Sequence, residues 1–107
     1  MKPTPAWGVL LALVTSAAHA QQDPGPQALY VKSLAATCAN CHGTNGRTVP
    51  TSAVPALAGM PRTYIIEQMK AFKSGARAAT VMHQLAKGYN DAQIEAIAGY
   101  FAAQPRQ

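Results

Sequence analysis

Apolar positions recur with helical spacing in three segments of the chain. In the last segment they follow the i, i+3, i+4, i+7 pattern of one buried helix face, at Ile94, Ile97, Ala98 and Phe101. Asn90 precedes this stripe as a candidate helix N-cap, and Gln93 three residues later completes a capping-box pattern. The chain from Asn90 to about Ala103 is therefore expected to form an amphipathic helix.

A second helix is predicted from Pro61 to Ser74. Its apolar stripe consists of Ile65, Met69 and Phe72. Proline suits the first turn of a helix, where its missing N–H is not needed, and the glycine that follows Ser74 is a suitable C-terminal stop.

The first helix is expected over residues 27–37, with Pro26 in its first turn and Tyr30, Leu34 and Cys38 on one face. Residues 43–55 are rich in Gly, Pro, Ser and Thr and are expected to form a loop. Residues 78–87 are expected to hold one or two helical turns, ended by a glycine. No segment alternates as a strand does, so the predicted fold class is all-α, with three main helices and long connections.

The first twenty residues have the order of a secretory signal peptide. A basic residue, Lys2, precedes a short apolar run over residues 6–14, and Ala18-His19-Ala20 follows as a small-x-small cleavage site. A membrane anchor is the alternative, but the run is shorter than the ~20 residues that span a bilayer. We expect cleavage after Ala20, a single domain over residues 21–107, a periplasmic location and no stable membrane insertion.

Composition and charge exclude several classes of protein. The chain has 107 residues, enough for one domain, and 49% of them are hydrophobic, which excludes a disordered tail. Two cysteines cannot build a multi-disulfide scaffold. The net charge of +5 favours docking on an acidic partner, since nucleic acid is a poor partner for an exported protein.

The motif Cys38-Ala39-Asn40-Cys41-His42 has the C-x-x-C-H pattern of covalent c-type haem attachment. Cys38 and Cys41, three residues apart on a helical turn, can each form a thioether with a haem vinyl group. The next residue, His42, is then the expected proximal ligand of the iron. One covalent haem c would also supply the apolar core that so small a domain lacks.

Three other interpretations of the motif are weaker. A disulfide would close a tight loop of unsuitable geometry, and a thioredoxin-type pair needs a βαβ context that the pattern does not predict. A zinc site would need a fourth ligand from His83 or a carboxylate, without a second Cys/His cluster to supply it.

The sixth iron ligand determines the function, because electron carriers close this position, usually with Met. Met82, between the second and last helices, is the predicted distal ligand. His83 and Met60 are the alternatives, with His83 otherwise expected to face solvent, and Met69 is expected to pack in the core. A proline carbonyl is expected to accept the Nδ1–H of His42, with Pro55 preferred over Pro50.

With these residues in place, the chain resembles a class I cytochrome c over nearly all of residues 21–107. More narrowly, it is similar to the cytochrome subunit of flavocytochrome c sulfide dehydrogenase and its small single-haem relatives. The segments that carry this likeness are Val54-Pro55-Ala56-Leu57-Ala58-Gly59, the stretch from Tyr64 to Gly75, and Met82 with Ala86-Lys87-Gly88-Tyr89.

The resemblance implies the class I cytochrome c fold, with Cys38 and Cys41 binding the haem and His42 and Met82 as axial ligands. It also implies crossed terminal helices, with Tyr100 or Phe101 against the first helix near Tyr30.

The function implied is single-electron transfer, with electrons accepted from an FAD-containing, sulfide-oxidising flavoprotein and passed to a downstream acceptor. The chain is then an electron-transfer protein by itself, or the cytochrome subunit of a sulfide dehydrogenase. A free-standing carrier between respiratory complexes is the first alternative. A haem-based sensor or gas-binding protein with an open sixth site is the second, and a thiol–disulfide oxidoreductase is a remote third.

Overall fold

The computed structural model describes residues 1–3 and 24–106, and its described part is all-helical. The helices are α1 (Gly25–His42), the 3₁₀ helix η1 (Thr44–Gly46), α2 (Arg62–Ser74), α3 (Met82–Lys87) and α4 (Asp91–Ala102). No strand occurs in these described ranges, which confirms the predicted fold class. The expected signal peptide and its cleavage site fall largely on residues 4–23, outside the described residues.

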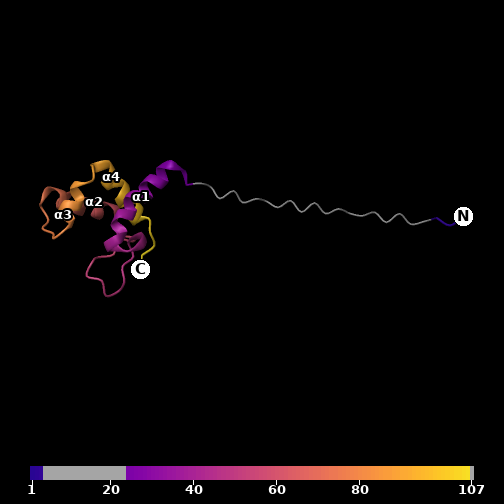
Figure 1. Cartoon of the computed structure of the whole chain (residues 1–107), viewed down its shortest axis with the longest axis horizontal. Helices are drawn as coiled ribbons and strands as arrows, with labels where there is room; N and C mark the ends of the chain where they lie inside the picture. The colour runs from indigo at the N-terminus through magenta and orange to yellow at the C-terminus, as the bar shows by residue number, and fades with distance from the viewer. Residues whose placement is uncertain (4–23, 107) are drawn as a thin grey trace.

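α2 and α4 pack on each other at the centre of the helical part, and the long connection between α1 and α2 loops away from the helices (Figure 1). α2 packs on α3 and on α4, whereas α1 packs on α4 and η1. The buried core joins residues from α1, α2, α3 and α4: Ala35, Ile65, Met69, Ala86, Ile94, Ile97, Ala98 and Phe101. The predicted stripe of α4 therefore lies in the core, and Met69 is a core residue as expected.

Local signals place the helix ends where the sequence predicts them. Pro61 caps α2, and Gly75 ends it in the left-handed conformation, φ 82°, with its N–H donating to the Phe72 carbonyl. At α4 the capping box is formed in both directions. The Gln93 N–H donates to Asn90 Oδ1 at 2.8 Å, and the Asn90 N–H donates to Gln93 Oε1 at 3.0 Å.

Replacing Asn90 with alanine should lower the free energy of unfolding by about 1 kcal/mol, because the N3 amide loses its side-chain acceptor. A denaturant titration of the folded protein measures this loss. Asn90→Asp keeps the acceptor and should stay near the wild-type value, as should Gln84→Ala, whose side chain is exposed on α3. Unchanged stability of the Asn90→Ala variant would contradict the capping role.

The first helix differs from the prediction in two ways. It runs from Gly25 to His42 and so extends beyond residues 27–37 at both ends, and its buried residue is Ala35 rather than one of the predicted stripe residues Tyr30, Leu34 and Cys38. The small Ala35 side chain lets α4 approach closely, while Tyr30 stays 44% exposed.

The predicted contact between the terminal helices is present, with different partners. The Tyr30 hydroxyl accepts a hydrogen bond from Gln93 Nε2 at 3.1 Å, near the start of α4. Tyr100 lies further along α1, beside Ala35 and Ala39, where it lines a small pocket of about 140 Å³. Phe101 is fully buried in the core.

Candidate functional site

The two cysteines lie one helical turn apart near the C-terminal end of α1. Cys38 is half-buried against the core, whereas Cys41 is exposed, and both thiols are free. Burial raises the pKa of the Cys38 thiol, and the neighbouring Thr37 hydroxyl partly offsets this effect. Residues at i and i+3 share a helix face, so α1 presents both sulfurs on the same side of the helix.

The His42 side chain is oriented by a backbone carbonyl thirteen residues later. Its Nδ1 lies 2.7 Å from the carbonyl oxygen of Pro55. A carbonyl oxygen only accepts, so the Nδ1 carries the proton and donates it. The lone pair of the imidazole is therefore on Nε2, which is free to bind a metal ion. The prediction that Pro55 rather than Pro50 fixes the ring is confirmed.

Gly46 holds the Pro55 segment in place, a contact that the sequence did not reveal. Its carbonyl accepts two hydrogen bonds, from the N–H of Leu57 at 2.8 Å and of Ala58 at 3.1 Å. Gly46 has φ +77°, and a Cβ built there would lie 2.8 Å from both Ala58 N and Phe101 Cδ1. Only glycine fits this junction, which couples the loop after the motif to the segment that orients His42.

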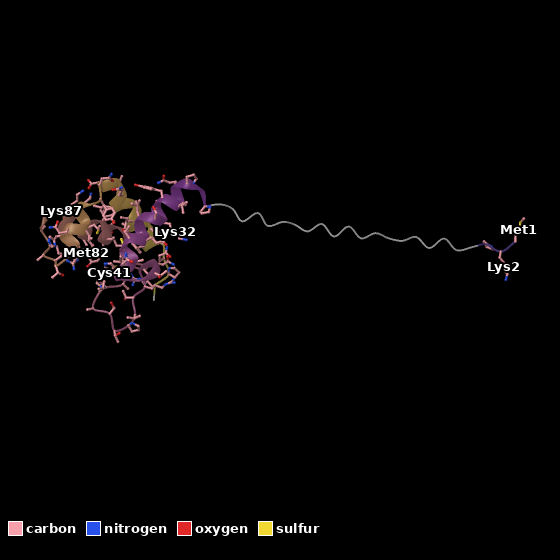
Figure 2. All side chains as sticks on the ribbon, viewed as in Figure 1. Met1, Lys2, Lys32, Cys41, Met82 and Lys87 are labelled. Carbon is pink, nitrogen blue, oxygen red and sulfur yellow. The ribbon has the colours of Figure 1, made fainter. Side chains whose placement is uncertain are left out.

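The candidate distal ligand, Met82, is the first residue of α3 and is half-buried against the core. Figure 2 places Met82 and Cys41 in the same part of the helical region, away from the labelled N-terminal residues. Met60 is also half-buried against the core, beside an open pocket of about 490 Å³. That pocket is lined by Ala56, Ala58, Met60, Pro61, Tyr64 and Arg106.

The expectation that His83 faces solvent is wrong. The side chain is half-buried, and its Nδ1 is buried without a hydrogen-bond partner. The ring packs into the protein because α3 lies directly on α2. Within the described residues, no three His, Cys, Asp or Glu side chains come together as a metal-binding group, so no partner set for a zinc site is present there.

The donor set fits a covalently attached haem. Two free thiols share one helix face, and the adjacent histidine has its Nδ1–H engaged and its Nε2 free. Several large apolar side chains after the motif are exposed in the structure: Val49, Tyr64, Val81 and Leu85.

Comparison with known proteins agrees with this donor set. The family model described as cytochrome c matches residues 27–104. A thiosulfate dehydrogenase electron acceptor of Thiomonas intermedia is 41% identical over 68 residues, which are 64% of this chain and 31% of that protein. The cytochrome subunit of sulfide dehydrogenase of Chlorobaculum tepidum is 43% identical over 68 residues, 64% of this chain and 60% of that protein.

A solved structure of cytochrome c4 from Acidithiobacillus ferrooxidans has the same fold, with a TM-score of 0.65 and 30% identity. The match covers 75% of this chain and 51% of that one. The chain thus spans between about a third and three fifths of the length of these relatives.

Proposed function

Because the chain belongs to the cytochrome c family, with its covalently bound c-type haem, we propose that it carries single electrons through one haem held by four of its residues. Cys38 and Cys41 form the thioethers. His42 is the proximal ligand of the iron, and Met82 is the distal ligand. The observation that carries this assignment is the hydrogen bond from His42 Nδ1 to the Pro55 carbonyl, because it leaves Nε2 for the iron.

When bound, the haem supplies a one-electron iron couple, and the residues of the chain set its potential. The Pro55 carbonyl raises the basicity of His42, since a hydrogen bond from Nδ1–H increases electron density on the ring. A methionine thioether at the sixth position raises the reduction potential. With side chains as both axial ligands, the chain carries electrons and leaves substrate oxidation to a partner.

The charge distribution supports an acidic redox partner. From Gln68 to Asn90 the sequence contains four cations, Lys70, Lys73, Arg77 and Lys87, and no Asp or Glu. This stretch forms most of α2, all of α3 and the connection between them, and it includes Met82. Lys70, Arg77 and Lys87 are exposed, whereas Lys73 is half-buried. Exposed cations on the elements near the proposed ligand speed encounter with an acidic partner.

The partner that fits best is an FAD-containing flavoprotein that oxidises sulfide, with this chain passing the electrons to a downstream acceptor in the periplasm. The similarity to a cytochrome subunit of sulfide dehydrogenase supports this choice. No helix within the described residues is long and apolar enough to cross a membrane. A free carrier is the second candidate, supported by the similarity to an electron acceptor of thiosulfate dehydrogenase.

The test begins with protein matured in a periplasm that contains haem-attachment machinery. The oxidised spectrum should show a weak far-red sulfur-to-iron band, and the reduced spectrum a sharp α-band. A protein with a high-spin spectrum that binds carbon monoxide in its ferrous form at neutral pH would instead favour the haem-based sensor.

The partner is tested separately. A tagged chain should co-purify with a flavoprotein from its native host. Its recovery as a reducible cytochrome without flavin would favour the free carrier.

A further inference from the structure

A hydrogen-bonded clamp joins the segment that carries Met82 to the helix that carries the cysteines. Tyr89 follows α3 by two residues, and its hydroxyl oxygen lies 2.6 Å from Thr37 Oγ1 on α1. Thr37 directly precedes Cys38, and its Oγ1 is 3.9 Å from the Cys38 sulfur. The clamp therefore connects the two parts of the chain that carry the proposed haem contacts.

The number of available protons shows which hydroxyl is the donor in the hydrogen bond between Thr37 and Tyr89. The Thr37 hydroxyl has one proton, which it donates to the Leu34 carbonyl at 2.7 Å. The Tyr89 hydroxyl therefore donates to Thr37 Oγ1. The result is a chain of two hydrogen bonds from Tyr89 through Thr37 to Leu34, in which each bond strengthens the next.

A second contact, from α2, fixes the same residue through its backbone. Lys73 Nζ on α2 donates to the Tyr89 carbonyl at 2.6 Å in a partly buried position. Ala86, near the end of α3, is fully buried in the core. The C-terminal end of α3 is thus held by α1, by α2 and by the core.

The N-terminal end of α3, where the half-buried Met82 lies, has side-chain packing but no hydrogen-bonded attachment of this kind. Residues 76–81 precede it and are exposed, apart from a half-buried Ala79. The α3 helix has no side-chain cap at its start. Because α3 is a single short helix of six residues, the hydrogen bonds of Tyr89 at its C-terminal end also set where its first residue, Met82, lies.

We propose that Tyr89 is a positioning residue for Met82, holding α3 against α1 so that the methionine stays at the iron. This inference rests on the proposed role of Met82 as the distal ligand. The effect of Tyr89 is through the position of α3, since its hydroxyl bonds to Thr37 and its carbonyl to Lys73. Without its hydroxyl, an exogenous ligand should replace the methionine more easily.

The experiment is a titration of the haem-bound ferric protein with imidazole, followed by loss of the far-red sulfur-to-iron band. Tyr89→Phe keeps the ring and removes the donor, so the band should disappear at about three- to tenfold lower imidazole, the range set by one hydrogen bond. Thr37→Val, which leaves the tyrosine in place, should give the same shift. The double variant should shift no further than either single one, because both remove the same interaction.

Tyr100→Phe is the matched control. The Tyr100 hydroxyl also makes a 2.6 Å hydrogen bond, to Asn45 Oδ1, but it lies on α4 and away from α3. This variant should keep the wild-type imidazole affinity. Equal shifts in the Tyr89 and Tyr100 variants would overturn the proposal, since they would indicate a general loss of stability. Wild-type affinity in Tyr89→Phe would also overturn it.

Failure of the proposed function has a different signature. In that case the wild-type protein lacks the far-red band before any imidazole is added. The proposal on Tyr89 fails by itself when the wild-type protein has the band and the Tyr89→Phe and Thr37→Val variants respond to imidazole as the wild type does.

Discussion

Replacing Met82 with alanine should abolish the far-red sulfur-to-iron band of the oxidised haem-bound protein. The reduction potential should fall by the order of 100 mV or more, because a methionine ligand raises the potential and axial ligands tune it over about 0.8 V. Met82 is the first residue of α3, so truncating its half-buried side chain leaves the helix backbone in place. Optical spectra and a redox titration measure both effects.

Met60→Ala is the control for this experiment. Met60 is also half-buried against the core, so its removal costs similar packing and should leave the far-red band intact. Loss of the band in Met60→Ala and its survival in Met82→Ala would make Met60 the ligand. A low-spin wild-type spectrum without the band, unchanged in Met82→Ala, would identify His83 as the ligand in its place.

A chain that cannot attach haem should be largely unfolded. In the double variant Cys38→Ala and Cys41→Ala no thioether forms, and the protein must then fold on its own side chains. Its buried hydrophobic core is small in the described residues and includes four alanines, and only Phe101, Ile94 and Ile97 are large side chains below 2% exposure. With so few large buried side chains, this small domain buries little apolar surface to offset its conformational entropy, and the haem is expected to supply the rest of the core.

Circular dichroism and thermal unfolding measure this loss. The double variant should show weak helical signal and no cooperative transition, whereas the haem-bound wild type melts cooperatively. The Met82→Ala variant is a useful reference, because it keeps the attached haem and should keep most of its helical signal. A compact, cooperatively melting double variant would show that the haem is dispensable for folding.

The helix ends and the core of α4 could be predicted because their causes are local. The Asn90 capping box, the glycine after α2 and the stripe that ends at Phe101 depend on residues within a few positions of one another. The same holds for the cysteine motif, whose spacing is itself the signal. Pro55 could be anticipated as the partner of His42 only as one of two prolines in the following loop.

The contacts that escaped prediction join residues far apart in the chain. The Gly46 carbonyl accepts hydrogen bonds from Leu57 and Ala58, and the Phe101 ring packs so close to Gly46 that it leaves no room for a side chain there. The Tyr89 hydroxyl bonds to Thr37, which is 52 positions earlier in the chain. His83 follows a methionine in a short helix, where spacing alone does not tell which side packs on α2. These positions are set by tertiary packing, which a periodic pattern does not encode.

The location of the core in the last helix has a consequence for the order of folding. Four core residues, Ile94, Ile97, Ala98 and Phe101, lie on α4, so α1 has no completed partner surface until the end of the chain is available. Contacts between α1 and α4 are also the most distant in sequence, and such contacts form slowly. The cysteine motif therefore stays accessible to a haem-attachment enzyme until α4 has packed on α1 and formed the core.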